Sequence, residues 1–359
     1  MRIRALMVIL LAVGLVGCSQ TGRPTSKNRA GSSPVPMSVT ARIRNVYPAE
    51  VEFARGSIWV LAGVNGPNEM TPVVRIDPDS NRVIARIDPG NGYISGGGWQ
   101  MADDPTGLWI VMPTMSNPPD AFGPGPVPKD IQTVYTAGHR IRADLNNEAV
   151  AGGLALIDPA TNRVRRRIMF LDWTPTSVVS TTAGLWIAAG DRSGGILALM
   201  DPRTGVFRSV RAANDGMLRT GFGSLWMSDG GRLHRLDPTT GRVTAVFDSG
   251  NVRDLGIGPD AVWITTDRQV IRIDPATNRI VARIDLPDAW GIAADGRGVV
   301  ATSFRTHQLV RIDPARNEIR DRIDLGVPDP GNPVTTEIAL TAESAWVVNG
   351  AELVRVALS

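Results

Sequence analysis

Cysteine and histidine are scarce in this chain. Cys18 is the only cysteine among 359 residues, so no internal disulfide can form. The three histidines are His139, His234 and His307, and no two of them lie at the spacing of zinc ligands. A serine triad needs a histidine beside a nucleophile and an acid, and no nucleophile-elbow motif occurs. The sequence therefore argues against a zinc enzyme and against a serine hydrolase.

Acidic residues are missing from the first 49 positions. That stretch carries seven basic residues, whereas positions 50 to 359 hold 31 basic against 35 acidic residues. The formal charge of +3 and the pI near 9.5 therefore reflect the N-terminus, and the remainder of the chain is slightly acidic. Because a basic footprint is absent from the body, we expect no nucleic-acid partner.

An apolar run from Ala5 to Val16 follows two arginines, in the layout of a secretory signal, and it is too short to span a bilayer. It ends in Leu15-Val16-Gly17-Cys18, which resembles the lipobox at which bacterial lipoproteins are cleaved and lipidated. We expect a signal peptide at residues 1–17 and a lipid on Cys18 that anchors the protein to the cell membrane, facing the extracytoplasmic side. An ordinary signal peptide cleaved nearby is the alternative.

Residues 18–38 contain the expected lipidated cysteine and a tether. The stretch after Cys18 is rich in Ser, Thr, Gly and Pro and lacks hydrophobic periodicity, which favours a flexible coil. A coil of about twenty residues reaches roughly 25 Å, enough to hold a domain just off a membrane. The folded domain is then expected at residues 39–359.

The body is built from an internal repeat. Each copy contains one element that ends in a tryptophan or valine and a second element that ends in Asp-Pro. From residue 158 onward the Asp-Pro pairs recur every 36 to 43 residues, which is the length of one propeller blade. Seven copies of the first element occur, at Trp59, Trp109, Trp186, Trp226, Trp263, Val300 and Trp346. Apolar alternation divides each copy into four strands, A to D. The sequence predicts an all-β, seven-bladed β-propeller whose tryptophans pack between blades.

The C-to-D turns show a strict residue choice. Proline after aspartate suits the second position of a type I turn, and a left-handed residue must follow to match the twist of the strands. Only Asn and Gly occupy that position: Asn81, Asn162, Gly205, Gly241, Asn278 and Asn317. The six aspartates could be metal ligands, but hydrogen bonds to their own turns account for every one.

The last copy lacks a strand D, because the chain stops soon after Leu353–Val356. Val39–Arg44 matches the strand D at residues 83–88 almost position for position. We expect it to pair beside the C-terminal strand, which closes the ring and removes an exposed sheet edge.

The repeat resembles the YVTN-type and virginiamycin B lyase-like (streptogramin lyase-like) propellers, whose blades carry a Gly-x-Trp strand and an Ile-Asp-Pro-x-Thr-Asn-Arg turn. The resemblance covers residues 39–359 except one insertion. In such lyases, catalysis is expected from histidines and a carboxylate near the heads of the inner strands, assisted by magnesium. No histidine stands at those heads here, whereas acids do, so the histidines of the lyases have no match in this chain.

Strand A lines the channel of a propeller, and loops on a rigid scaffold carry function. The residue columns at the strand heads include Arg253 and three acids, Glu50, Asp254 and Glu337. Together with Asp288, these acids could converge on a calcium or magnesium ion. A solvated ring of mixed charge is the alternative. Aromatics outside the tryptophan column suit a ligand at the channel mouth, or are buried under loops. The candidate ligand-binding residues are Trp99, Trp173, Arg253, Trp290, Glu50, Asp254, Glu337 and His307.

The second copy holds an insertion at residues 113–150, since Trp109 and Asp158 lie 49 positions apart instead of the 11 found in the fourth and fifth copies. Loops this long form lids or are disordered. We expect either a lid or partner-docking segment on the ligand face, or a decorative loop.

Two functions follow. The first is a monomeric, membrane-anchored binding protein without a cofactor, whose channel mouth lies beneath the insertion and takes an unknown protein, peptide or small molecule. The second is a metal-assisted lyase or hydrolase that uses the channel carboxylates as acid and base. Metal bound by Glu50, Asp254 or Glu337 would favour the second.

Overall fold

The computed structural model describes residues 36–62, 73–89, 100–113, 131–136, 139–141, 152–170, 173–191, 194–213, 216–229, 231–328 and 337–358. All of them belong to the second of the two units into which the chain divides, residues 35–359. Their regular structure is β throughout, and no helix in this part of the chain is long and apolar enough to cross a membrane.

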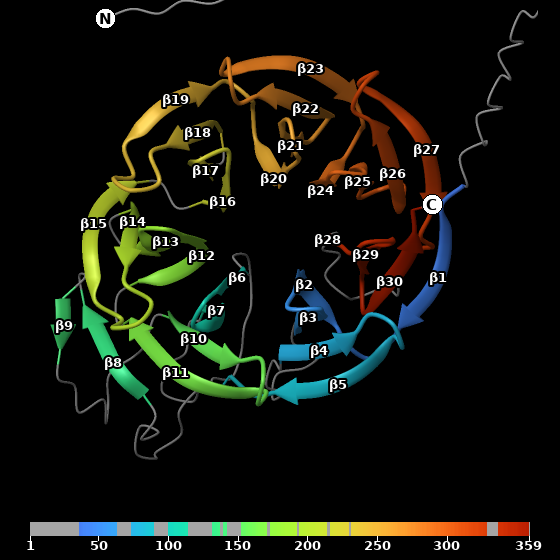
Figure 1. Ribbon diagram of the computed structural model, residues 1–359. Helices are drawn as coiled ribbons and strands as arrows, with labels where there is room; N and C mark the ends of the chain where they lie inside the picture. The colour runs from blue at the N-terminus through green and yellow to red at the C-terminus, as the bar shows by residue number, and fades with distance from the viewer. Residues whose placement is uncertain are drawn as a thin grey trace, which may run out of the picture. The chain divides into compact units, whose positions relative to one another are not determined.

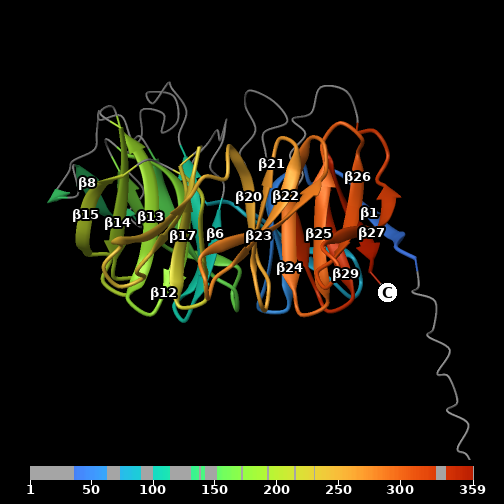
Figure 2. The same cartoon turned by 90° about the horizontal axis from the view of Figure 1, so that it is seen from above.

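Seven sheets stand in a ring around a central channel, as predicted (Figure 1). Seen from the side, the sheets stand next to one another like the blades of a propeller (Figure 2). The innermost strands are β2 (Pro48–Ala54), β6 (Met101–Asp104), β12 (Thr174–Thr181), β16 (Leu218–Gly221), β20 (Val252–Ile257), β24 (Ala289–Asp295) and β28 (Ile338–Leu340). The second strands are β3 (Ser57–Ala62), β7 (Gly107–Pro113), β13 (Gly184–Asp191), β17 (Ser224–Ser228), β21 (Val262–Thr266), β25 (Gly298–Ser303) and β29 (Ser344–Asn349).

The third and fourth strands complete each blade in antiparallel order. The third strands are β4 (Val73–Asp77), β10 (Gly152–Asp158), β14 (Gly194–Met200), β18 (Leu233–Leu236), β22 (Gln269–Asp274), β26 (Gln308–Asp313) and β30 (Glu352–Ala357). The outermost strands are β5 (Arg82–Ile87), β11 (Arg163–Phe170), β15 (Phe207–Ala213), β19 (Val243–Phe247), β23 (Arg279–Asp285), β27 (Glu318–Asp324) and β1 (Ser38–Ile43).

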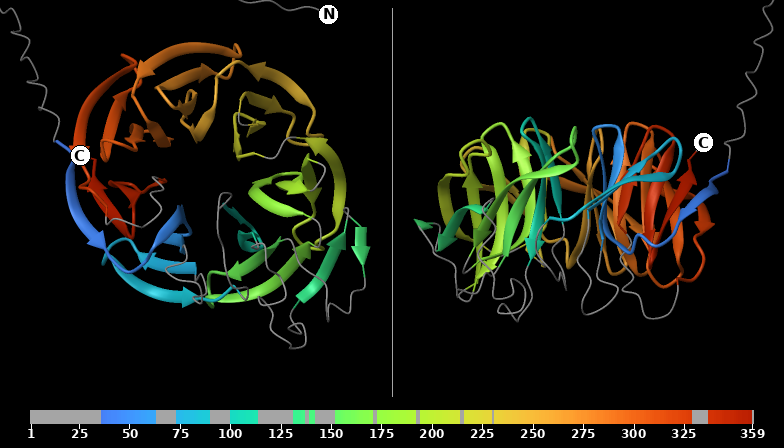
Figure 3. Two further views of the ribbon diagram at one scale, coloured as in Figure 1. Left: turned by 180° about the vertical axis from the view of Figure 1, so that it is seen from behind. Right: turned by 90° about the horizontal axis from the view of Figure 1, so that it is seen from below.

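Strand β1 closes the ring by pairing with β30, the last strand of the chain. The pairing is antiparallel, with Val39 opposite Val356 and Ile43 opposite Leu353. Figure 3 shows β1 on the outside of the blade that the C-terminal strands build. The seventh blade therefore takes its fourth strand from the N-terminal end of the domain, which confirms the prediction from the sequence match.

The insertion in the second blade extends the outer edge of that blade. Strands β8 (Ile131–Thr136) and β9 (His139–Ile141) follow β11 in the sheet, and β8 runs parallel to it (Figure 1). For the described part of the insertion, the expectation that it covers the ligand site is therefore wrong. Strand β8 pairs with the outer edge of β11, on the side of the blade away from the channel. The remainder of residues 113–150 lies outside the described residues.

The six C-to-D turns have the predicted backbone. Asn81, Asn162, Asn278 and Asn317 have φ between 55° and 58°, and the two glycines also have positive φ. Each aspartate accepts hydrogen bonds within its own turn, for example Asp77 from the amides of residues 79 and 80. Gly241 is required for a second reason, since a Cβ there would lie 2.7 Å from the ring of Trp186.

The tryptophan column forms the core between blades, and all six of its tryptophans are fully buried. Arginines of the third strands stack on four of them and reach the next blade. Arg272 lies 5.2 Å from the centre of the Trp263 ring and donates hydrogen bonds to the Pro314 carbonyl and the Asn317 side chain. Arg75, Arg235 and Arg355 make the same contacts from their own blades.

Candidate functional site

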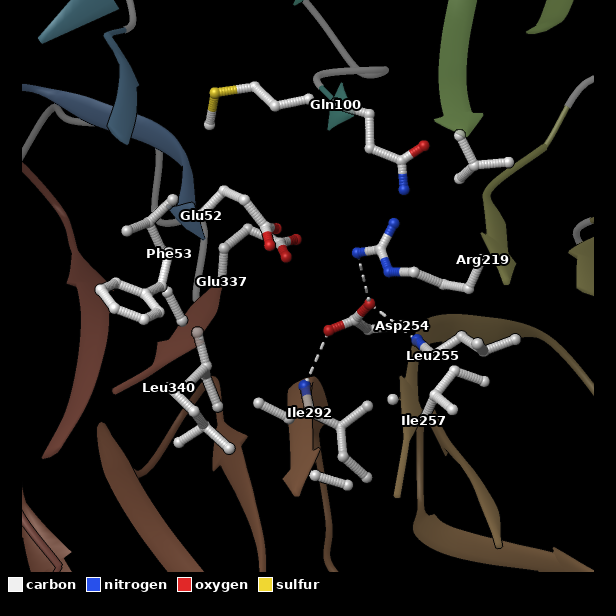
Figure 4. A pocket seen from close by; sticks show the side chains of 18 of the residues that line it. Glu52, Phe53, Gln100, Arg219, Asp254, Leu255, Ile257, Ile292, Glu337 and Leu340 are labelled. Carbon is white, nitrogen blue, oxygen red and sulfur yellow. Dashed lines mark hydrogen bonds and ion pairs between the residues drawn. The ribbon is translucent and has the colours of Figure 1, made fainter. Parts of the chain in front are cut away.

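The central channel is a cavity of about 510 Å³ lined by the inner strands of all seven blades. Much of its wall is apolar and comes from side chains such as Val51, Leu255, Ile292 and Ile338. The polar groups that line it are mostly acidic, and Arg219 is the only basic side chain in the described wall. The channel thus combines an apolar wall with negative charge (Figure 4).

Part of the polar column at the strand heads is structural. The Gln100 side chain accepts a hydrogen bond from the Val178 amide, and the Ser177 hydroxyl accepts one from the Leu218 amide. In the same way, Asp254 accepts a hydrogen bond of 2.7 Å from the Ile292 amide. Each of these side chains therefore joins its inner strand to an inner strand of the following blade.

Asp254 is also the partner of the channel arginine. It is 1% exposed, and its carboxylate lies 3.6 Å from Nη2 of Arg219. Burial raises the pKa of Asp254, and the charge of Arg219 and hydrogen bonds from the Ile292 and Leu255 amides oppose that rise. Burial alone would lower the pKa of Arg219, but the surrounding carboxylates raise it, so this side chain carries a fixed positive charge.

Three further carboxyls, those of Glu50, Glu52 and Glu337, gather on the opposite side of the channel. Figure 4 shows the ends of Glu52 and Glu337 next to each other, facing Arg219 and Asp254. Glu50 is 5% exposed and interacts electrostatically with Glu337, Arg219 and Glu52. Among the residues that the structure describes, no side chain or amide donates a hydrogen bond to any of these three carboxyls. Asp254, in contrast, accepts hydrogen bonds from the Leu255 and Ile292 amides.

Burial and mutual repulsion shift the pKa values of these three groups upward. Burial, followed by the charge of Glu337, raises the pKa of Glu50 well above its ordinary value. Burial raises the pKa of Glu52 to about 7, against the influence of Arg219. Burial and the charge of Asp254 raise the pKa of Glu337 to about 8. The channel therefore holds more acid groups than its one arginine can neutralise.

The carboxylates do not form a metal cage. Among the residues that the structure describes, no three Asp, Glu, His or Cys side chains lie close enough to share one metal ion. Asp288, which the sequence grouped with the channel acids, lies instead on the rim, 3.3 Å from Nε of Arg305. Within the described part of the chain, three carboxylates therefore cannot bind one divalent cation together.

A second group of candidate residues forms a cluster at the rim of the channel, on blades five and six. Arg253 lies 4.9 Å from the centre of the Trp290 ring, and the Trp290 and Phe304 rings are 5.4 Å apart at an interplanar angle of 31°. Trp290 and Phe304 are both partly exposed. The structure thus brings together Arg253 and Trp290, two of the candidate ligand-binding residues.

Charged groups surround this rim cluster. Asp267 binds Arg253 at 2.6 Å and is 56% exposed, and Asp288 and Arg305 form a second, more open pair. The backbone fixes these positions, because the Asp288 amide donates to the Asp267 carbonyl and the Phe304 amide donates to the Asp288 carbonyl. We call the Arg253, Trp290, Phe304, Asp267 and Asp288 group the rim cluster.

Other candidate residues lie elsewhere. Trp173 is 3% exposed and packs against Phe170 and Phe207, so its ring is part of the core between blades and the expectation of ligand contact is wrong for it. His307 lies in the turn before β26, where its carbonyl accepts a hydrogen bond from the Leu325 amide, and it is not part of the described channel wall. Trp99 and Cys18 lie outside the described residues.

Glu52 is the channel residue that the sequence reasoning missed. It lies two positions after Glu50 on β2, and residues at that spacing share one face of a strand. The strand-head columns include Glu50 but end there, although the alternation of β2 carries the acidic face further into the channel. Reading the same face two positions deeper finds Glu52 in blade one and Arg219 in blade four.

The fold and the site together define a seven-bladed β-propeller with an acidic channel and an aromatic rim. No family model matches the sequence, and no curated protein matches it either. Similar folds occur among solved structures. The WD40 domain of Neurospora crassa Pan2 aligns with a TM-score of 0.63 at 9% identity, over 91% of this chain and 97% of that domain. A chain of the Kuenenia stuttgartiensis hydrazine synthase aligns with a TM-score of 0.59 at 13% identity, over 89% and 98%. At these identities the likeness concerns the fold alone.

Proposed function

We propose that the protein is a membrane-anchored, extracytoplasmic binding propeller of the YVTN or virginiamycin B lyase-like type, which holds a peptide, protein or small-molecule ligand at the rim cluster. The observation that supports this most directly is the partly exposed stack of Arg253, Trp290 and Phe304. Aromatic and guanidinium groups next to exposed charges contribute most of the affinity in many binding sites. The rest of the ring supplies a rigid support for that surface.

Anchoring rests on the N-terminal residues. We propose that residues 1–17 are a signal peptide, that Cys18 is lipidated, and that the segment up to residue 38 is a tether. In bacterial cells, an alkyne-labelled fatty acid is expected to mark the full chain, and Cys18→Ser is expected to abolish the label. If the Cys18→Ser protein keeps the label in the membrane fraction, the proposed lipid site is wrong.

The alternative function, a metal-assisted lyase or hydrolase, has less support. It requires carboxylates that share one cation, and within the described part of the chain no such group of three exists. The binding function requires only the rim cluster and the anchor.

Site-specific photocrosslinking tests the binding site in cells. A photoreactive phenylalanine analogue at position 304 is expected to give discrete adducts, because Phe304 is partly exposed and stacked in the rim cluster. The same analogue at position 84, an exposed residue on the outermost strand β5, is the matched control. Trp290→Ala is expected to remove the position 304 adducts. Equal adducts from positions 304 and 84 would contradict the proposed site.

A further inference from the structure

We propose that the central channel is a second binding site, which takes the ammonium group of an alkylamine between Glu50, Glu52 and Glu337. The ligand class is a primary ammonium at the end of a short alkyl chain, either a free amine or a lysine side chain. This site is separate from the rim cluster, so it does not depend on the function proposed above.

The first support is that the buried carboxyl of Glu50 has no hydrogen-bond donor among the described residues. Glu50 is 95% shielded from solvent, yet within the described part of the chain no group donates a hydrogen bond to its carboxyl. Buried polar groups normally have hydrogen-bond partners, and a buried carboxylate without one is costly. Its strongest electrostatic neighbours are Glu337 and Arg219, both of which line the channel, and Glu50 lies on the same face of β2 as Glu52, which also lines it.

The second support is the balance of charge around the cavity. Arg219 is committed to Asp254 at 3.6 Å, and Asp254 is further held by two backbone amides. Two other acids of the wall have their own arginines, since Asp103 pairs with Arg55 at 2.6 Å and Asp295 pairs with Arg297. Among the described residues, the three glutamates therefore form no salt bridge of their own, and only the longer-range charge of Arg219 opposes their raised pKa values.

The shape of the site favours an organic cation over a metal ion. A divalent metal needs several oxygens at about 2.0–2.6 Å from one centre, and no three acidic side chains of the described wall converge that closely. An ammonium group needs no such convergence, because one carboxylate can accept from it at about 2.9 Å while the other carboxylates attract its charge from a longer distance. The cavity of about 510 Å³ also exceeds the size of an ion, and its apolar residues, among them Val51 and Ile338, suit the methylenes of an alkyl chain.

Calorimetric titration of the full chain in mild detergent at pH 8 tests this site. The probe is 1,5-diaminopentane, the uncharged match is 1,5-pentanediol, and N-acetyl-lysine-N-methylamide represents a lysine side chain. We expect the diamine to saturate at one per chain and the diol to give no binding. Binding of the lysine amide with similar affinity would indicate a polypeptide side chain as the source of the ammonium. Its exclusion would indicate a free amine.

Variants assign the binding to the three glutamates. Glu50→Gln, Glu52→Gln and Glu337→Gln are each expected to weaken diamine binding at least tenfold, whereas Glu318→Gln on the exposed outer strand β27 leaves it unchanged. Because Glu52 is partly exposed, its variant remains informative if the buried Glu50→Gln protein fails to fold. Trp290→Ala is expected to bind the diamine normally, which separates this site from the rim cluster.

Two results would overturn the proposal. The first is diamine binding that is absent in the folded wild-type protein or is unaffected by Glu52→Gln and Glu337→Gln. The second is binding of calcium or magnesium that depends on these glutamates and excludes the diamine, which would make the channel a metal site. As a further readout, diamine binding at pH 7 is expected to release protons, because the raised pKa values of Glu52 and Glu337 fall when a cation approaches. Titration in two buffers of different ionisation enthalpy measures that release.

Discussion

At the scale of single residues, the ring is joined by a contact that repeats from blade to blade. Arg272 stacks on Trp263 within its own blade and donates to Pro314 and Asn317 of the following one. The planar guanidinium can stack and donate at once, which a lysine cannot. Where the arginine is replaced by Leu199 in the third blade, the Trp186 indole itself donates to the Pro238 carbonyl at 2.7 Å. The asparagine of a C-to-D turn, such as Asn317, therefore has two roles. It adopts the left-handed backbone of its own turn, and its side chain accepts a hydrogen bond from the arginine of the preceding blade.

Asn278 provides a test of these two roles. Its φ is 55°, and its side-chain oxygen accepts a hydrogen bond of 2.7 Å from Arg235 of the preceding blade. Asn278→Ala loses both the easy left-handed backbone and the bond, so we expect a loss of about 2 kcal/mol in the free energy of unfolding. Asn278→Gly keeps the backbone and is expected to lose about half as much. Chemical denaturation measures both, and equal losses would show that the backbone conformation contributes nothing.

At the scale of strands, β1 is the only partner of β30 on its outer side. Five residue pairs align the two strands, and Arg42 of β1 also donates to the Leu325 carbonyl of the sixth blade at 2.8 Å. The strand thus contacts two blades at the point where the ring closes. Without it, β30 would present an unpaired edge.

Truncation tests this closure. A chain that begins at residue 47 lacks β1, and we expect it to lose cooperative unfolding and to aggregate through β30. A chain that begins at residue 36 keeps β1 and is expected to melt like the full protein. Calorimetry of both chains decides the matter, and a cooperative transition of normal temperature in the shorter chain would disprove the role of β1.

The repeat made the strands and turns predictable from sequence because each copy restates the same local rules. A left-handed Asn or Gly after Asp-Pro identifies a hairpin whatever surrounds it, and the match of residues 39–44 to a strand D identifies the closing strand. The sites were less predictable, since they depend on which blade lies next to which. Trp173 and Trp290 both lie near the heads of inner strands, yet one is packed between Phe170 and Phe207 and the other is partly exposed.

The position of the inserted strands could not be predicted from the sequence either. Its length indicates a departure from the repeat, but no rule of alternation says which sheet edge a new strand will join. In the structure β8 adds to β11, the strand on the outer side of its blade, and leaves the inner strand β6 at the other edge of the sheet.

At the scale of the whole molecule, two groups of carboxyls make stability depend on pH in opposite directions. The turn aspartates have lowered pKa values because backbone amides and side chains donate to them, for example at Asp77 and Asp237. They stabilise the fold above the unfolded pKa of about 3.8, and that contribution is lost as the pH falls below it. The channel glutamates have raised pKa values and behave in the opposite way.

The folded protein therefore binds more protons than the unfolded chain between pH 4.5 and about 8, the range between the ordinary pKa of a glutamate and the raised pKa values of Glu52 and Glu337. The raised pKa of Glu50 acts in the same direction. The slope of unfolding free energy against pH is negative in that range, so stability is greatest near pH 4 to 5 and falls as the pH rises toward 8. Asp254, also raised, adds to this slope, while Arg219 keeps its charge throughout.

Removing one of these acids should flatten the curve. Glu337→Gln cannot lose a proton, so we expect the variant to be more stable than the wild type at pH 8, by on the order of 2 kcal/mol after allowance for water in the channel, and equally stable at pH 4. Denaturant unfolding at half-unit steps between pH 4 and 9 measures the difference. Below pH 4, the free energy of unfolding should fall in the same way in both proteins, because the substitution leaves the turn aspartates in place. A wild-type stability that rises between pH 5 and 8 would mean that the channel glutamates are already ionised and compensated in the folded protein.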